Sequence, residues 1–271
     1  MPRVSRVGRG DAPVSPLRSL GLFVLLLLAF YACLLALLYV NQRSLLFLPQ
    51  FTRDPQVAPD FRFEVEGATL HGWVVNPGQP KALLYFGGNA EDVSMSRDDV
   101  AALAPQHSVY LVAYRGYGHS SGEPSEAALA ADAIALFDHL TASHRVVDVL
   151  GRSLGSGVAV HVAAVRPVRR LALVTPFDSA KRVAQAYYPW VPMGWLLKDP
   201  FENWRRAPTL TMPVMIVIAG QDEVLAPAHA KALAAALPRP PEVLRLPEAG
   251  HNDVQVFPEY AAGLRRFFAA E

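Results

Sequence analysis

A strand, a sharp turn and a helix follow one another directly near the middle of the chain. The β-branched run at 146–150 ends in Gly151-Arg152-Ser153-Leu154-Gly155, and the helix-compatible run at 158–164 begins almost at once. A chain can turn this tightly only where neighbouring residues carry no Cβ, which is what Gly151 and Gly155 provide. The turn lifts the Ser153 side chain to its apex. A sheet whose strands lead directly into helices is therefore the first constraint on the fold.

Short apolar runs recur along the rest of the chain and alternate with helix-like stretches. Uninterrupted apolar runs of this length predict buried strands. Their alternation with helices indicates a mostly parallel sheet that helices cover on both faces. The predicted strands lie at about 61–66, 70–75, 82–86, 108–113, 146–150, 171–174, 214–219 and 242–246, and the predicted helices at 125–140, 228–237 and 255–270.

The start of the chain differs in composition from the rest. No residue from Ser19 to Gln42 is charged, and residues 20–40 are almost wholly apolar. As a helix, this stretch spans about 31 Å, which matches the hydrocarbon core of a bilayer. We therefore expect a basic head at 1–18, a transmembrane anchor at 19–41 and one folded domain at 42–271. A short connector is expected to open that domain at 42–49.

A cleaved signal peptide and a buried helix of a soluble protein are the alternatives for the apolar stretch. A signal peptide has a shorter apolar run and a small-residue cleavage site, and neither is found here. The basic head carries four arginines, so the positive-inside bias predicts a cytosolic N-terminus and an extracytoplasmic domain, periplasmic in a bacterial source. The only cysteine, Cys33, lies within the stretch, so no internal disulfide can form.

The charge of the folded domain is nearly balanced. Beyond the basic head, the chain keeps 21 of its 25 basic residues and 23 of its 24 acidic residues. Nucleic-acid binding needs a concentrated basic face, so this balance argues against it. No dinucleotide fingerprint follows a strand, and no His, Cys and carboxylate residues have metal-ligand spacing. We expect neither a cofactor nor a metal.

Two further residues complete a possible catalytic set around Ser153. A serine hydroxyl becomes nucleophilic when a histidine takes its proton and a carboxylate orients that histidine. Asp222 follows the strand at 214–219 and His251 follows the strand at 242–246, so both lie at the sheet edge where sites gather. The chain order Ser153, Asp222, His251 is that of α/β hydrolases. Asp178, Glu223 and Asp253 remain alternatives for the acid.

A second match to the pattern Gly-x-Ser-x-Gly occurs at 118–122, with Ser120 at its centre. The strand before it ends five residues too early for a tight strand-to-helix turn. Pro124 also disfavours the helix that should already have begun. We interpret 118–122 as a turn-rich loop.

Negative charge that develops on a carbonyl oxygen needs two backbone N–H donors beside the serine. The amide of Leu154, at the start of the helix, is one candidate. The strand at 82–86 runs into Gly87-Gly88-Asn89, where glycines let the backbone face the site, so the Asn89 amide is the other. No Gly-Lys-Ser/Thr follows, so this is not a phosphate-binding loop.

Residues 178–212 interrupt the alternation of strands and helices and are rich in aromatic residues and prolines. We interpret them as a small cap. Its simplest role is packing on the main domain. The alternative is a lid that meets acyl chains or the bilayer surface, because Trp and Tyr favour interfaces. Tyr187, Trp190 and Trp195 are the candidate substrate contacts.

Taken in order, these motifs resemble the α/β-hydrolase superfamily, in its membrane-anchored branch that includes lysophospholipid lipases and protein depalmitoylases. The resemblance implies the α/β-hydrolase fold and cleavage of an ester or thioester bond by Ser153, with His251 as base and Asp222 as its partner. Gly87 departs from the pattern, because such relatives commonly carry histidine there. Besides the strand–turn–helix segment, the motifs that carry the resemblance are residues 42–49, 86–90, 114–122, 220–222 and 250–253.

Two other functions stay open beside this resemblance. A serine peptidase or amidase uses the same three residues, and a non-catalytic membrane scaffold could retain the fold. The expected partners are a small-molecule ester or acyl-lipid substrate and the bilayer, without nucleic acid. The sequence leaves the oligomeric state and the acyl chain length open.

Overall fold

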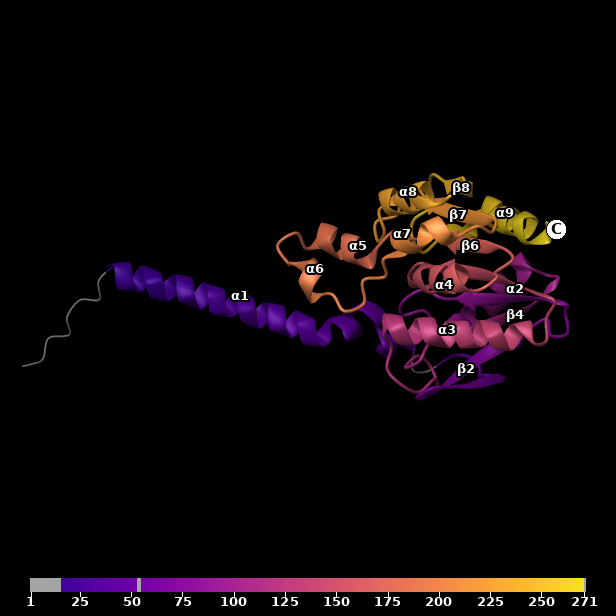
Figure 1. Ribbon diagram of the computed structural model, residues 1–271, viewed down its shortest axis with the longest axis horizontal. Coiled ribbons are helices and arrows are strands. Elements are labelled where there is room, and N and C mark those ends of the chain that lie inside the picture. Colours follow the sequence, from indigo (N-terminus) through magenta and orange to yellow (C-terminus); the bar gives the residue numbers. More distant parts are fainter. Residues whose placement is uncertain (1–15, 53–54, 271) are drawn as a thin grey trace, which may run out of the picture. The chain divides into compact units, whose positions relative to one another are not determined.

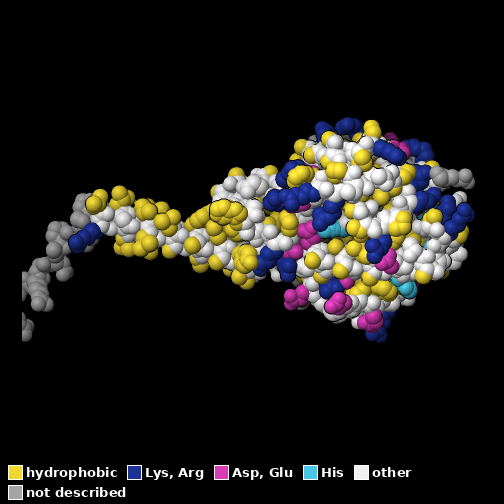
Figure 2. Space-filling model, in the orientation of Figure 1, with side chains coloured by type: hydrophobic (Ala, Val, Ile, Leu, Met, Phe, Trp, Pro, Cys, Tyr) yellow, Lys and Arg dark blue, Asp and Glu magenta, His cyan; other side chains and the backbone are white. Residues whose placement is uncertain are grey.

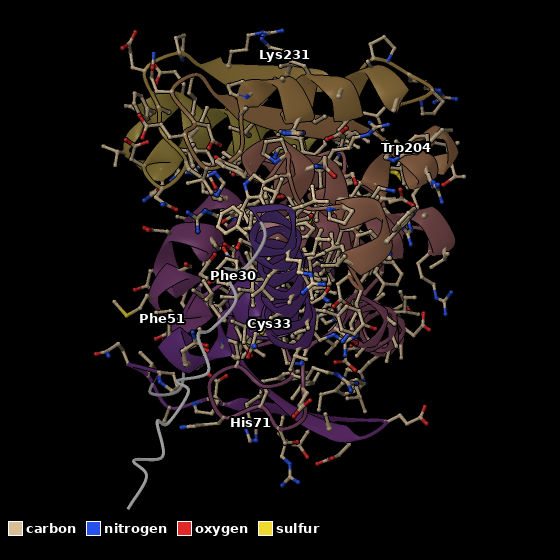
Figure 3. The ribbon with its side chains drawn as sticks, turned by 90° about the vertical axis from the view of Figure 1, so that its left-hand side faces the viewer. Phe30, Cys33, Phe51, His71, Trp204 and Lys231 are labelled. Carbon is tan, nitrogen blue, oxygen red and sulfur yellow. The ribbon has the colours of Figure 1, made fainter. Side chains whose placement is uncertain are left out.

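The computed structural model describes residues 16–52 and 55–270 and divides into two compact units, Met1–Asn41 and Gln42–Glu271. Most of the basic head, including Arg3, Arg6 and Arg9, lies outside the described residues. Helix α1, Pro16–Phe47, supplies the described part of the first unit. By length and composition this helix can cross a membrane, although a signal sequence passes the same test. Hydrophobic side chains dominate its visible surface (Figure 2), and Phe30 and Cys33 lie on it (Figure 3).

The connector expected at 42–49 is wrong for most of its length, because helix α1 continues to Phe47. Residues 42–47 contain no glycine or proline, so nothing in them interrupts the backbone ladder. The helix ends where Leu48 adopts a positive φ of 52° before Pro49, a residue that cannot extend it. The 3-10 turn η1, Pro49–Thr52, follows.

The second unit is built on one sheet of eight strands in the order β1-β2-β4-β3-β5-β6-β7-β8. The β1–β2 and β2–β4 pairs are antiparallel, and all remaining pairs are parallel. The mostly parallel sheet predicted from the apolar runs is thus confirmed. The strands are β1 Phe61–Val65, β2 Ala68–Val75, β3 Lys81–Phe86, β4 His107–Val112, β5 Val146–Arg152, β6 Leu171–Val174, β7 Val214–Ala219 and β8 Glu242–Leu246.

Helices cover both faces of the sheet, with α3 and α4 packed side by side on one face and α2 and α9 on the other (Figure 1). Helix α2 was not predicted from the sequence, because its seven residues are too few for a clear periodic pattern. The longer helices are α2 Arg97–Leu103, α3 Glu126–Thr141, α4 Leu154–Val165, α8 Pro227–Ala236 and α9 Pro258–Ala269. Shorter elements are α5 Ala180–Tyr187, α6 Met193–Leu196, α7 Asn203–Arg206 and the 3-10 turns η2 Val93–Ser96, η3 Ala207–Thr209 and η4 Val254–Val256.

The central strands are apolar because helices exclude water from both of their faces. Every residue of β6 and β7 is buried, and five of the six residues of β3 are. In register, Leu84 of β3 lies between Tyr110 of β4 and Val149 of β5. The outer strand β1 alternates between half-buried and exposed residues, as expected for a strand with one solvated face.

Helix α4 leaves β5 so closely that no side chain fits between the two elements. A Cβ on Gly151 would lie 2.5 Å from the carbonyl oxygen of Gly155 and 2.7 Å from the Cβ of Ala159. A Cβ on Gly155 would collide with the carbonyl oxygen of Phe86 and lie 2.6 Å from that of Gly87. These neighbours are mainly backbone atoms of central elements, which cannot move aside as a flexible side chain can. The two glycines therefore fix the turn that carries Ser153.

We predict that Gly155→Ala lowers the free energy of unfolding by about 3 kcal/mol or more, because the added methyl overlaps the β3 backbone. Urea unfolding followed by circular dichroism measures the change. Gly194→Ala is the matched control, because a Cβ at Gly194 meets no atom within 4 Å. Equal unfolding curves for the two variants would contradict this account of the turn.

Candidate active site

Ser153 stands at the strained apex between β5 and α4. Its backbone has φ 50° and ψ −117°, a combination that costs a non-glycine residue roughly 1–3 kcal/mol. The surroundings hold this conformation: the Ser153 N–H donates to the carbonyl of Val174 at 2.9 Å. The Ser153 carbonyl in turn accepts from the Ser156 hydroxyl at 2.7 Å and from the Ser156 N–H at 2.9 Å. Strain that is held this firmly is typical of a functional position.

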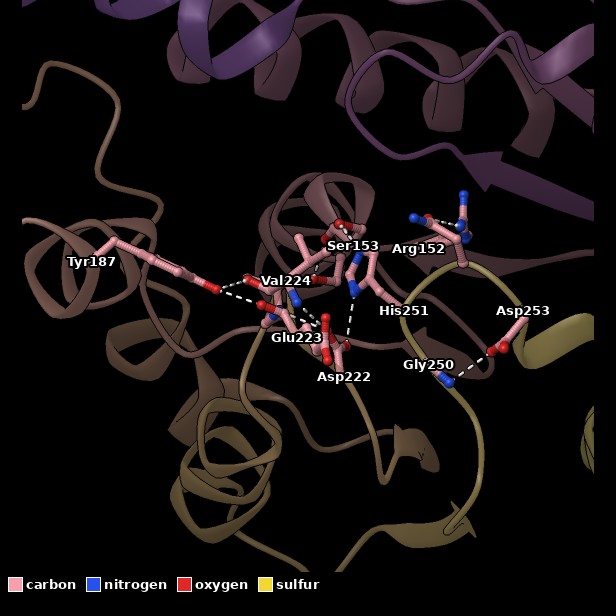
Figure 4. A network of polar contacts seen from close by, with 12 residues as sticks. Arg152, Ser153, Tyr187, Asp222, Glu223, Val224, Gly250, His251 and Asp253 are labelled. Atoms are coloured by element: carbon pink, nitrogen blue, oxygen red, sulfur yellow. Dashed lines mark hydrogen bonds and ion pairs between the residues drawn. The ribbon is translucent and has the colours of Figure 1, made fainter.

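Three predicted site residues from distant parts of the chain meet here (Figure 4). The Nε2 atom of His251 lies 2.9 Å from the Ser153 hydroxyl, and its Nδ1 atom lies 2.8 Å from Oδ2 of Asp222. All three side chains are buried. Ser153 follows β5, Asp222 follows β7 and His251 follows β8, so the parallel strands deliver them to the same edge of the sheet.

The surroundings of Asp222 determine how the histidine is protonated. Its Oδ1 atom accepts from the backbone N–H of Val224 at 2.9 Å and of Leu225 at 2.6 Å. A carboxylate that accepts these bonds is held as an acceptor, so Nδ1 of His251 donates to it. Nε2 is then the acceptor for the Ser153 hydroxyl proton. The arrangement can therefore take a proton from Ser153 and deliver it to a leaving group.

Three other histidine–carboxylate pairs occur in the described residues, and none of them reaches a serine hydroxyl. His229 lies 2.7 Å from Asp178, and Arg182 lies 2.6 Å from the same carboxylate. Asp178, an alternative acid, is thus already held by the cap. The other two pairs are His107 with Asp148 at 2.8 Å and His161 with Glu126 at 3.1 Å.

The remaining alternatives also have other roles. Asp253 accepts from the Gly250 N–H at 2.7 Å and so shapes the loop that carries His251. The side chain of Glu223 is not needed for orientation, because Asp222 already occupies that position. Burial lowers the pKa of His161 to about 4, which keeps it neutral at physiological pH. Ser120 is buried, donates to the carbonyl of Ala113 at 2.9 Å and accepts from the His71 N–H, so it holds a loop together.

Two backbone amides are the candidates for binding an oxyanion beside Ser153. Leu154 is the first residue of α4, so its N–H has no partner within the helix. In the loop after β3, the Gly88 N–H is already donated to Glu91 at 2.6 Å and the Ala90 N–H to the carbonyl of Phe47 at 3.4 Å. The Asn89 amide lies between them, and Asn89 itself is exposed. The predicted pair, Leu154 and Asn89, therefore remains the best candidate.

Comparison with known proteins agrees with this geometry. A family model for the α/β hydrolase fold matches residues 81–203. An uncharacterized protein of Mycobacterium tuberculosis is 35% identical over 234 residues, which cover 81% of this chain and 83% of that protein. Alpha/beta hydrolase domain-containing protein 17B of Xenopus laevis is 32% identical over 201 residues, which cover 72% of this chain and 68% of that one. The chain belongs to the α/β-hydrolase family.

Solved structures share the fold at low sequence identity. The enol-lactonase from Burkholderia xenovorans LB400 superposes with a TM-score of 0.62 at 18% identity, over 78% of this chain and all of that one. An esterase from Pyrococcus furiosus has a TM-score of 0.61 at 16% identity, over 79% of this chain and 97% of that one. At this identity the likeness establishes the fold alone.

Glu91, a residue that the sequence analysis did not single out, holds the loop after β3 in this α/β hydrolase. Oε2 of Glu91 accepts from the Gly88 N–H at 2.6 Å and from Arg152 at 2.9 Å. Oε1 accepts from the hydroxyls of Tyr85 at 2.7 Å and Ser96 at 2.8 Å. Four donors thus converge on one carboxylate. The only sequence signal was its closeness to Gly87-Gly88-Asn89.

Arg152 connects this carboxylate to the rest of the site. While one of its nitrogens bonds Glu91, another donates to the side-chain oxygen of Asn252 at 2.9 Å. Arg152 precedes Ser153 and Asn252 follows His251 in the chain. One guanidinium therefore connects the loop after β3 to the chain neighbours of both Ser153 and His251. A guanidinium can bridge two residues in this way because its N–H groups point in fixed, different directions.

Glu91 also fills the space beside Gly87, the position at which the sequence departs from the pattern expected from the resemblance. A Cβ on Gly87 would lie 3.2 Å from the carboxyl carbon of Glu91 and 2.6 Å from a methyl of Val93. The space beside Gly87 is thus already filled. The hydroxyl of Tyr114 also donates to the Gly87 carbonyl at 2.8 Å. Loop support, left in doubt by the sequence, comes from Glu91 and Tyr114.

The cap reaches the site through one of the three predicted substrate contacts. The Tyr187 hydroxyl lies 2.6 Å from the carbonyl of Glu223 and 3.1 Å from that of Val224, and so ties α5 to the Asp222 loop. The Trp195 side chain is 91% exposed and the Trp190 side chain 52% exposed. At the base of the cap, Trp204 stacks against Arg182 and Arg205 (Figure 3).

Among residues 16–52 and 55–270, no group of three or more His, Cys, Asp or Glu side chains could hold a metal ion.

We predict that Glu91→Ala lowers kcat on the order of tenfold and leaves KM nearly unchanged, because the loop amides matter most when charge develops in the transition state. Ester hydrolysis measured against substrate concentration separates the two constants. Glu91→Gln keeps an oxygen acceptor for Gly88 and should recover part of the rate. Exposed Glu123→Ala is the control. A rise in KM at constant kcat would place Glu91 in substrate binding instead.

Proposed function

We propose that this α/β hydrolase is a membrane-anchored serine hydrolase that cleaves carboxylic ester or thioester bonds, with acyl lipids or lipid-like molecules as substrates. One observation carries the proposal: the unbroken chain of hydrogen bonds from Ser153 through His251 to Asp222 at the strained turn. Backbone strain at Ser153 is costly, and its combination with a histidine aligned on the hydroxyl favours a catalytic site over a non-catalytic scaffold.

The first half of the reaction forms an acyl-enzyme. As the Ser153 oxygen attacks the substrate carbonyl, Nε2 of His251 takes the hydroxyl proton, and Asp222 stabilises the resulting imidazolium through Nδ1. The carbonyl oxygen becomes an oxyanion that accepts from the amides of Leu154 and Asn89. When the intermediate collapses, the bond to the leaving alcohol or thiol breaks, and His251 returns the proton to that group.

Water completes the cycle by the same steps. His251 takes a proton from a water molecule as that water attacks the acyl carbonyl. The second oxyanion meets the same two amides, and its collapse releases the carboxylic acid and restores the Ser153 hydroxyl. Removal of one oxyanion donor typically costs about 3–4 kcal/mol of barrier. The hydrogen bond from the Gly88 N–H to Glu91 would hold this loop in place for the Asn89 amide.

Acyl substrates are supported by the position in the chain of the second unit, Gln42–Glu271, called the catalytic unit below. It follows an apolar helix long enough to span a bilayer, which would keep the site close to lipids. The arginines of the basic head favour a cytosolic N-terminus and an extracytoplasmic catalytic unit, periplasmic in a bacterium. Peptidase or amidase activity is the alternative in the same site, since the triad chemistry is shared and only the leaving group differs.

Replacement of Ser153 tests the nucleophile directly. We predict that Ser153→Ala abolishes both fluorophosphonate labelling and ester turnover in detergent-solubilised full-length protein, with an unchanged melting curve. Ser120→Ala, in the second Gly-x-Ser-x-Gly match, should keep the label wherever its melting curve shows a folded protein. Peptide mass spectrometry locates the adduct. A label on any residue other than Ser153, or no label on folded wild-type protein, would overturn the proposal.

Leaving-group preference separates the esterase from the amidase. We predict that acyl p-nitrophenyl esters and acyl thioesters are turned over at rates well above those of p-nitroanilides with the same acyl group. Ser153→Ala measured in parallel gives the background for each substrate. Preferential turnover of the anilides would assign the site to amide hydrolysis.

A further inference from the structure

The tip of the cap is an uncharged surface segment. Residues 183–197 contain no Asp, Glu, Lys or Arg. Helix α5, which forms part of this tip, has no buried residue. Figure 1 shows α5 and α6 projecting from the layered body of the catalytic unit. Four aromatic side chains of the tip are at least half exposed: Tyr187 at 55%, Tyr188 at 52%, Trp190 at 52% and Trp195 at 91%.

Charged residues flank the tip on both sides and form ion pairs with residues outside the tip. On the side before the tip, Lys181 binds Glu202 at 2.7 Å and Arg182 binds Asp178 at 2.6 Å. After the tip, Asp199 binds Arg43 at 2.8 Å. These ion pairs hold the two stems of the tip, residues 181–182 before it and 198–199 after it, in place. The aromatic tip between them is left facing outward.

The side chain of Gln42 holds the end of the tip and the stem that follows it. The Gln42 amide nitrogen donates to the carbonyl of Leu196 at 3.0 Å, and its oxygen accepts from the Lys198 N–H at 2.7 Å. Gln42 is the first residue of the catalytic unit and follows the apolar stretch at 20–40 almost immediately in the chain. If a bilayer holds residues 20–40, the chain leaves it close to Gln42, the residue that binds the stem.

We propose that the cap tip, residues 183–197, is a second membrane contact that inserts its aromatic side chains into the phospholipid interface. The inference rests on the proposed function for the membrane anchor, and it adds a lipid-binding surface on the cap. Trp and Tyr favour this region of a bilayer because their rings are apolar and their N–H or O–H groups can still meet water or headgroups. Flanking Lys181, Arg182 and Lys198 add attraction for anionic headgroups.

The contact gives a physical reason for the exposed tryptophan. An indole that is 91% exposed to water contributes no burial to the fold, whereas the interface would cover its apolar surface. Because Tyr187 is tied to the loop after Asp222, the same contact keeps the site entrance near the acyl chains. Substrate would then reach Ser153 from the membrane side.

Tryptophan quenching by brominated lipids tests the insertion. Full-length protein is reconstituted in phosphatidylcholine nanodiscs with or without bromine on the acyl chains, and the tryptophan emission is compared. We predict that bromolipid quenches the wild-type protein and that Trp190→Phe/Trp195→Phe removes most of that quenching. Trp204→Phe is the matched control, because Trp204 lies at the cap base against Arg182 and Arg205, and it should leave the quenching unchanged.

The outcomes separate this inference from the proposed function. Fluorophosphonate labelling of the same nanodisc samples reports the nucleophile independently of the lipid contact. Labelled Ser153 with no quenching that depends on Trp190 and Trp195 overturns the membrane contact and leaves the hydrolase intact. In that case the aromatic tip serves a protein partner or a second copy of the chain. Quenching without labelling keeps the contact and overturns the hydrolase.

Discussion

The contact between the backbones of α4 and β3 is the constraint on which the site depends. Gly155 lies against the carbonyl of Phe86, so the first turn of α4 touches the end of β3 with no side chain between them. This approach fixes two features at once. It sets the angle at which the chain leaves β5, and so the strained apex at Ser153. It also brings the loop after β3 beside the N-terminus of α4. The proposed nucleophile and the proposed oxyanion amides thus depend on the same close contact between two backbones.

Hydrogen bonds then extend this local geometry across the sheet edge. Glu91 gathers donors from β3, from the loop after it and, through Arg152, from β5. Arg152 passes the connection to Asn252, beside His251. Asp222 is fixed separately by two backbone amides of its own loop. The Arg152 guanidinium thus joins the loop after β3 to the neighbours of Ser153 and His251, whereas Asp222 is held by its own loop. Pre-organisation of this kind reduces the reorganisation needed when charge develops.

The sequence could predict what local signals encode. Apolar runs fixed the strands to within about two residues, and glycine spacing marked the turn at Ser153. The candidates Asp222 and His251 followed from the ends of strands, because parallel strands share an edge. The contacts of Glu91 could not be foreseen, since its donors come from residues 85, 88, 96 and 152, which only the folded sheet brings together. The end of α1 was mispredicted because the change from apolar to polar residues at 41–43 does not break a helix; Leu48 and Pro49 do. Exposure at Trp195 also had no sequence signal, because aromatic content does not reveal which way a side chain faces.

The cap divides its tasks between stems and tip. Ion pairs of Lys181, Arg182 and Arg43 lock the stems, whereas the uncharged residues between them contribute few bonds to the body of the protein. Substitutions within the tip at 183–197 therefore leave the ion pairs of the stems unchanged. Protein engineers can use the same separation, grafting new tips between fixed stems to change what the enzyme encounters without altering how it reacts.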